Sequence, residues 1–177
     1  MKRADLEHII RAAAANADTD EIVVIGSQAI LGTISEPPAE LCQSIEADVF
    51  PKRKPGDSIL IDGAIGEESM FHRTFGYYAH GVGSDTAVLP EGAFERLVPV
   101  RNENTRGNTG WCLELHDLAV SKLAAGRDKD LSFVSAMLAH KFINAGTVRE
   151  RIAMVRNKEQ ASLAEQRLNR VTGSRVA

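Results

Sequence analysis

The strongest constraint on the fold is a short run of β-branched residues, Ile22 to Ile25, that ends directly in Gly26-Ser27. β-Branched side chains pack well in sheets, so this run predicts a buried strand. Gln28 to Leu31 follow without a break and are compatible with a helix. The chain is therefore expected to turn from a strand into a helix at Gly26-Ser27, as proteins that combine the two element types do.

The rest of the sequence extends this pattern into a βα front half and a helical last third. A helix is expected over residues 4–16, because the apolar residues there recur at helical spacing. The other expected elements are a strand over 45–50, helices over 58–65 and 67–71, strands over 77–82, 86–89, 94–100 and 111–115, and helices over 118–125, 131–142, 147–155 and 159–170. The fold class is therefore α/β (α+β).

Composition narrows the class of protein. The 177 residues suffice for one compact unit, and 21 basic against 24 acidic residues give a net charge of -3. A global attraction to nucleic acid or to an anionic membrane is therefore not expected. The sequence also contains no long apolar run and no signal peptide, and Cys42 and Cys112 form no metal or disulfide pattern. We expect a cytoplasmic protein without a membrane partner.

Two acidic residues alternate with apolar ones in the predicted strand over 45–50. Because side chains alternate along a strand, Glu46 and Asp48 share one face and the apolar residues share the other. Neighbouring carboxylates repel each other unless they are solvated or a divalent cation lies between them, and Mg²⁺ prefers one or two carboxylates together with phosphates and water. The pair indicates either a Mg²⁺ site or a half-exposed strand with a polar face.

The Gly26-Ser27 turn is the second candidate for chemistry. Glycine lets a ligand approach the backbone, and the Ser27 hydroxyl can cap the following helix or bind a phosphate near the positive end of the helix dipole. The segment is neither a dinucleotide fingerprint nor a Walker A loop. Taken alone, the turn favours a purely geometric role, which is the commoner use of such a pair after a strand.

Taken in order, the strand, Gly26-Ser27, the loop and the Glu46-x-Asp48 strand resemble the signature of the nucleotidyltransferase superfamily, which has the polymerase-β-like fold. Residues 117–130 read DLAVSKLAAGRDKD and resemble a stretch found in small bacterial nucleotidyltransferase-like proteins. These proteins include the DUF6036 family and relatives of the AbiEii toxins. Tyr78 to Val82 and Val88 to Gly92 also match a run of the DUF6036 type, and the resemblance covers about residues 20–145.

The resemblance implies a mixed β-sheet nucleotidyltransferase core over residues 1–115, with flanking helices and a C-terminal helical segment over 116–177 that packs on it. It further implies transfer of a nucleoside monophosphate from an NTP to a hydroxyl acceptor on a protein, an RNA or a small molecule. By resemblance, Gly26 and Ser27 hold the triphosphate, and Glu46 and Asp48 are the catalytic residues that bind Mg²⁺.

Three cations of the 117–130 segment are implied to face the phosphates or the acceptor, namely Lys122, Arg127 and Lys129. On one continuous helix Lys122 and Lys129 share a face, with Arg127 offset from it unless the helix breaks near Gly126. A triphosphate carries about four negative charges, which cations and Mg²⁺ would offset. The alternative is a solvated helix surface with Asp130 as the N-cap of the next helix.

One departure from the superfamily pattern concerns a third acid, which active members supply from a neighbouring strand. In the predicted strand over 77–82 the best polar candidate is His80, and Asp85 lies just beyond it. Loss of the third acid implies a single metal site, weak transfer, or nucleotide binding without turnover. The alternative function is therefore an inactive binding module, such as a toxin-antitoxin component that acts through a protein partner. A Mg²⁺-dependent phosphatase built on the same strand is a third possibility.

Overall fold

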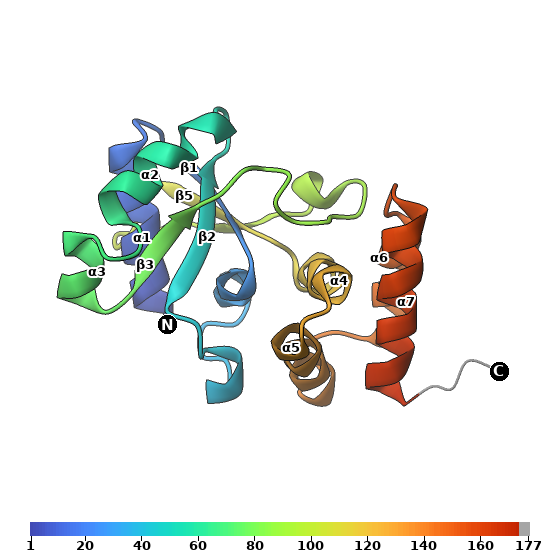
Figure 1. Cartoon of the computed structure of the whole chain (residues 1–177). Coiled ribbons are helices and arrows are strands. Elements are labelled where there is room, and N and C mark those ends of the chain that lie inside the picture. The colour runs from blue at the N-terminus through green and yellow to red at the C-terminus, as the bar shows by residue number, and fades with distance from the viewer. Residues whose placement is uncertain (174–177) are drawn as a thin grey trace.

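The computed structural model describes residues 1–173 and shows a mixed sheet with helices on both sides (Figure 1). The sheet has five strands in the order β3-β2-β1-β5-β4. β1 pairs antiparallel with β2 and parallel with β5, whereas β2 and β3 are parallel and β4 and β5 antiparallel. The strands are β1 (Glu21–Ile25), β2 (Glu46–Pro51), β3 (Tyr78–Gly81), β4 (Val98–Val100) and β5 (Thr109–Cys112). The expected mixed sheet and α/β class are confirmed.

Side-chain alternation places the acidic residues of β2 on one face of the sheet and the apolar residues between and after them, Ala47 and Val49, on the other. Val24 of β1 and Val49 of β2 are paired and fully buried, and they lie on the face that α1 and α2 cover. The paired residues one position along, Ile25 and Asp48, lie on the opposite face. Figure 1 shows α1, α2 and α3 on one side of the sheet and the last four helices beyond the other side. The acidic strand therefore turns its polar side chains toward the C-terminal helices.

The helices begin and end close to where the sequence predicts them. Those of the first half are α1 (Arg3–Asn16), α2 (Ser58–Ile65) and α3 (Met70–Phe75). α3 starts later than the predicted 67–71 because the Ser69 hydroxyl accepts a hydrogen bond from the His72 amide at 3.1 Å and so caps the helix there. The helices of the second half are α4 (Leu115–Ala125), α5 (Asp128–Ala139), α6 (Ala145–Ala153) and α7 (Lys158–Thr172).

The strand predicted over 86–89 is wrong, because these residues form a loop. Val88 and Leu89 are apolar and pack against the core, which explains the prediction. They follow a turn closed by the Thr86 amide on the Gly83 carbonyl, and they precede Pro90, whose nitrogen has no hydrogen to donate to a neighbouring strand. Burial alone does not make a strand where no partner strand is available.

Three other predicted boundaries move for local reasons. Of the strand predicted over 94–100 only β4 forms, because Ala93–Glu95 is a short 3₁₀ helix, η4. The strand predicted over 111–115 is β5, which ends at Cys112, since the Glu114 carboxylate accepts hydrogen bonds from two backbone amides and starts α4. The helix predicted after Gly26-Ser27 is a 3₁₀ helix, η1 (Ser27–Gly32).

Candidate metal and phosphate site

Four polar side chains meet on one face of β2 and β3. Glu46 is paired with Tyr78 and Asp48 with His80 in the parallel register of the two strands. Paired residues point to the same side of a sheet, so all four side chains lie together, while Ala47 between the acids is fully buried on the other side. The predicted placement of Glu46 and Asp48 on one face is confirmed.

His80 connects the two acids. Its Nδ1 lies 3.2 Å from Oε1 of Glu46 and 3.1 Å from Oδ1 of Asp48. The Tyr78 hydroxyl donates a hydrogen bond of 3.0 Å to Oε2 of Glu46. One ligand atom from each of Glu46, Asp48 and His80 lies within 4.8 Å of the other two. Two carboxylates and an imidazole that converge in this way fit a divalent cation.

The pKa values of the acids reflect their close approach. Burial, reinforced by the neighbouring Glu46 carboxylate, raises the pKa of Asp48 from 3.8 to about 6. Burial also opposes ionisation of Glu46, but hydrogen bonds from Asp48, Tyr78 and His80 outweigh it and lower its pKa. Burial disfavours the His80 cation, yet the two carboxylates hold its pKa above the usual value. Protons on Asp48 and His80 would therefore compete with a cation for the same ligand atoms.

The Gly26-Ser27 turn lies directly beside the acids. Gly26 has a φ of 70°, and a Cβ atom at this position would lie 2.2 Å from Oδ2 of Asp48. Only glycine accommodates both the left-handed backbone and this close approach. The turn and the acidic strand, which are separate in the sequence, therefore meet at one place.

Lys122 of α4 positions the Ser27 hydroxyl through a hydrogen bond. Its Nζ donates to Oγ of Ser27 at 2.7 Å and to Oδ1 of Asp130 at 3.1 Å. Only 7% of Lys122 and 1% of Asp130 are exposed. The ammonium group is thus a buried, paired charge that fixes the Ser27 side chain, and Lys122 belongs to the candidate site through Ser27.

Arg127 is the exposed cation of this group. Its Nε lies 2.6 Å from Oδ2 of Asp130, and 61% of its side chain is exposed. The hydrogen bond to Asp130 raises the pKa of Arg127, and the charges of Asp48 and Glu46 raise it further, so the guanidinium lies within the field of the acids. Asp130 orients Arg127 and Lys122 at once, and it does not cap α5, whose N-cap residue is Arg127.

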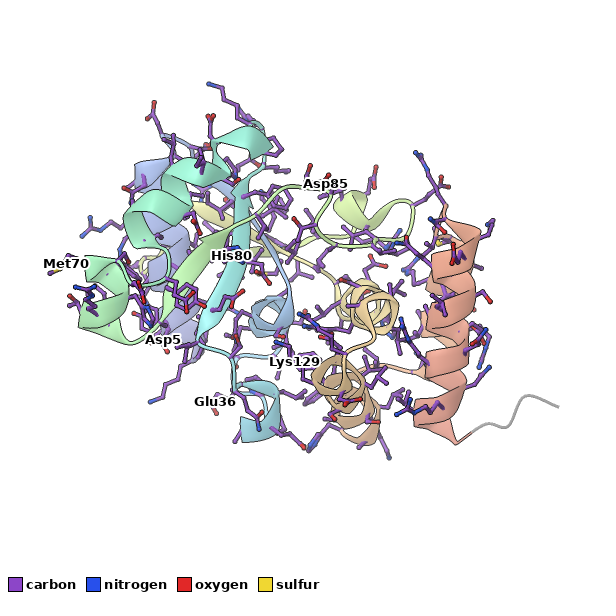
Figure 2. The ribbon with its side chains drawn as sticks, viewed as in Figure 1. Asp5, Glu36, Met70, His80, Asp85 and Lys129 are labelled. Atoms are coloured by element: carbon purple, nitrogen blue, oxygen red, sulfur yellow. The ribbon has the colours of Figure 1, made fainter. Side chains whose placement is uncertain are left out.

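Two of the expected site residues, Lys129 and Asp85, form no hydrogen bond or ion pair with this group in the part of the chain that the structure describes. Gly126, with a φ of 70°, ends α4, so Lys122 and Lys129 sit on different helices and share no common face. Lys129 is exposed on the first turn of α5 (Figure 2). Asp85 is exposed in the loop after β3, and within residues 1–173 the cluster of side chains that could hold a metal ion contains His80 and not Asp85.

The sequence interpretation missed two residues of the site, Tyr78 and Asp130. Tyr78 lies two positions before His80, so strand alternation was the signal that placed it on the same face. Asp130 was identified only as a possible helix cap. Its burial depends on how α5 packs on α4, which the local sequence does not encode.

Comparison with known proteins identifies a protein family that matches this chain. A family model described as a nucleotidyltransferase of unknown function, DUF6036, matches residues 4–173. Neither the curated proteins nor the solved structures gave a match. Among residues 1–173 no helix combines the length and the apolar character needed to cross a membrane.

Proposed function

The chain belongs to the DUF6036 family of nucleotidyltransferases of unknown function, and from this membership and the site geometry we propose that it transfers a nucleoside monophosphate from an NTP to a hydroxyl acceptor. The acceptor oxygen forms a bond to the α-phosphorus, the bond between the α-phosphorus and the bridging oxygen breaks, and pyrophosphate leaves. The observation that supports the proposal is the close approach of Gly26 to Asp48, because it places the turn that we propose to bind phosphate beside the acid pair.

Each group of the site has a role in this proposal. Glu46, Asp48 and His80 are suited to hold a divalent cation such as Mg²⁺, which when bound offsets charge on the phosphates. Ser27 and Arg127 bind the triphosphate, since a hydroxyl at the start of η1 and an exposed guanidinium beside it both donate to phosphate oxygens. The acceptor hydroxyl must lose a proton, and the acid pair and His80, which lie beside the turn, are the groups proposed to accept it.

A second candidate function is supported by the residue opposite Asp48. His80 occupies the position on β3 where an active superfamily member is expected to carry a third acid. With only two carboxylates, the site is suited to bind a metal and a nucleotide with little or no turnover. In that case the chain would be a binding module that acts through a partner protein.

Calorimetry with each of the common NTPs, in the presence and absence of Mg²⁺, tests the proposal. We expect saturable binding that requires the metal, and release of pyrophosphate when a suitable acceptor is added. Metal-dependent binding without product favours the binding module, and release of inorganic phosphate points to a hydrolase. A protein that binds no NTP at all contradicts the proposal. Glu103→Gln, which removes an exposed charge in the loop between β4 and β5, serves as a control that should bind like the wild type.

The affinity for a divalent cation should depend on pH. The pKa of Asp48 is about 6 in the metal-free protein and that of His80 is raised, and a cation binds only after these groups lose their protons. Affinity for Mn²⁺ should therefore rise about tenfold between about pH 5 and about pH 7.5 from the competition at Asp48 alone. Titrations followed by electron paramagnetic resonance measure free Mn²⁺ directly. A flat profile over this range would show that these side chains are not the ligands.

A further inference from the structure

We propose that Phe94 is an aromatic platform that stacks on the base of the bound NTP. The inference rests on the proposed function and identifies a contact that neither the family description nor the acid site provides. It follows from the position of an exposed ring on the sheet face of Asp48, on the side away from Ser27.

The strand register shows in which order the groups of the site lie along the sheet. β1 and β2 are antiparallel, with Ile25 opposite Asp48, so the chain that continues into Ser27 runs toward the Glu46 end of β2. Phe50 lies two residues from Asp48 in the other direction, about 7 Å along the strand and on the same face. The acids thus separate a polar end, where Ser27 lies, from an apolar end, where Phe50 lies.

The Phe94 ring packs against the Phe50 ring at the apolar end of the site. The two ring centroids are 6.5 Å apart and the ring planes meet at 71°. Phe50 is 2% exposed, whereas Phe94 is 47% exposed. The Phe94 ring therefore packs against Phe50, which follows Asp48 by two residues, while about half of Phe94 remains exposed to solvent.

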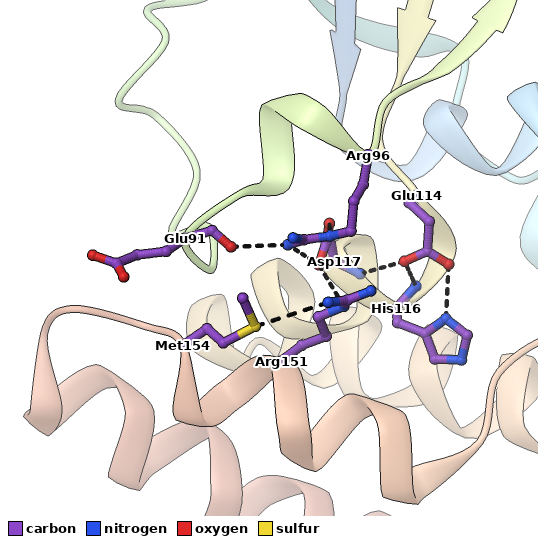
Figure 3. Close-up of polar contacts among 7 residues, drawn as sticks. All are labelled: Glu91, Arg96, Glu114, His116, Asp117, Arg151 and Met154. Carbon is purple, nitrogen blue, oxygen red and sulfur yellow. Dashed lines mark hydrogen bonds and ion pairs between the residues drawn. The ribbon is translucent and has the colours of Figure 1, made fainter.

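The segment that carries Phe94 is held rigidly. Nε and Nη2 of Arg96 lie 2.8 Å and 3.0 Å from the two carboxylate oxygens of Asp117, which is fully buried in α4 (Figure 3). Nη2 of Arg96 also donates to the Glu91 carbonyl at 3.1 Å, and the Glu91 amide donates to the Met154 carbonyl at 3.0 Å. A segment anchored before the ligand arrives loses little conformational entropy when the ligand binds.

The order of groups along the site selects the base as the ligand of Phe94. If the terminal phosphates bind at Ser27 and Arg127 and the reacting phosphate lies at the acids, the nucleoside extends toward the opposite end of the site. That end offers an aromatic surface at Phe50 and Phe94. Stacking of a base on an aromatic side chain is tolerant of base identity. We therefore expect binding of all four NTPs with modest discrimination.

The chain provides a matched control for this proposal. Phe75 is also 47% exposed, but it belongs to α3 and packs against Phe71, Tyr77 and His8. These contacts lie toward α1, on the side of the sheet away from the C-terminal helices. Phe75→Ala removes the same ring with the same exposure and leaves the proposed base site intact.

Calorimetry with Mg²⁺ and two ligands, ATP and inorganic tripolyphosphate, tests the proposal. Phe94→Ala should weaken ATP binding by about fivefold to 100-fold and leave tripolyphosphate binding unchanged, whereas Phe94→Trp should bind ATP at least as well as the wild type. Phe75→Ala should change neither affinity.

Two results would overturn the proposal and leave the proposed function standing, given a wild-type protein that binds both ligands. One is an unchanged affinity of Phe94→Ala for ATP. The other is an equal loss of affinity for ATP and for tripolyphosphate, which would show that Phe94 maintains the conformation of its loop and does not contact the base. A wild-type protein that binds neither ligand would overturn the proposed function, and this inference with it.

Discussion

Replacing Asp48 with Asn is expected to abolish metal-dependent NTP binding and at the same time to stabilise the metal-free protein. The pKa of Asp48 is raised from 3.8 to about 6, so above that pH the fold carries an ionised carboxylate that it disfavours. The cost is present above the folded pKa and disappears below the unfolded one. Asparagine keeps the shape without the charge, and the free energy of unfolding should rise by about 1–3 kcal/mol at neutral pH.

The binding effect of the same substitution should be much larger. Loss of one of two carboxylate ligands removes several kcal/mol of interaction with the cation and the charges it offsets, which corresponds to about a thousandfold or more in affinity or rate. Urea unfolding with and without Mn²⁺ measures the change in stability and the loss of metal binding, on which NTP binding depends, in one experiment. The wild type should gain stability from Mn²⁺ and the variant should not. A variant that is less stable without metal, or that still responds to Mn²⁺, would contradict this account of Asp48.

Replacing Asp130 with Ala is expected to cause a large loss of stability. The substitution removes the carboxylate that neutralises the buried Lys122 ammonium, which keeps the Ser27 hydroxyl as a hydrogen-bond acceptor and the Phe133 ring at 5.4 Å, and it releases Arg127. Removing one member of a buried ion pair costs about 3–5 kcal/mol. Thermal or urea unfolding measures the loss. Asp128→Ala is the matched control, because Asp128 lies in the same first turn of α5 but is exposed, and its loss should cost about 0.3–1 kcal/mol at most.

A double variant separates the structural role of this pair from its role in binding. Lys122→Met with Asp130→Leu removes both charges and replaces them with side chains of similar volume, so most of the stability should return. Ser27 then lacks the ammonium group that fixes its hydroxyl, and NTP affinity should remain below that of the wild type. Recovery of full affinity in the double variant would show that Lys122 does not position Ser27.

The parts of the site that could be predicted are those that the local sequence encodes. A β-branched run before Gly26 and the alternation around Glu46 fix a strand, a turn and the face of the acids, and each depends on only a few neighbouring residues. Their meeting in space was expected from a resemblance to a family. The contact between Gly26 and Asp48 agrees with that expectation.

The predictions that failed depend on packing between distant segments. Lys122 and Lys129 were placed on one face by assuming a continuous helix, but the glycine at 126 ends α4 and redirects the chain. Val88 and Leu89 have the composition of a strand and lie in a loop, because no strand edge is paired with them. Asp130 is buried by the packing of α5 on α4, and sequence spacing carries no signal for such a contact.

The central claim is that one site holds both a divalent cation and the triphosphate of an NTP. A crystal structure of the protein with Mn²⁺ and a non-hydrolysable NTP analogue tests it most directly, because anomalous scattering locates the metal independently of the rest of the density. The account predicts Mn²⁺ bound by Glu46, Asp48 and His80, with phosphate oxygens in hydrogen-bonding contact with Ser27 or Arg127. Mn²⁺ bound elsewhere, or phosphates bound away from the Gly26-Ser27 turn, would contradict it.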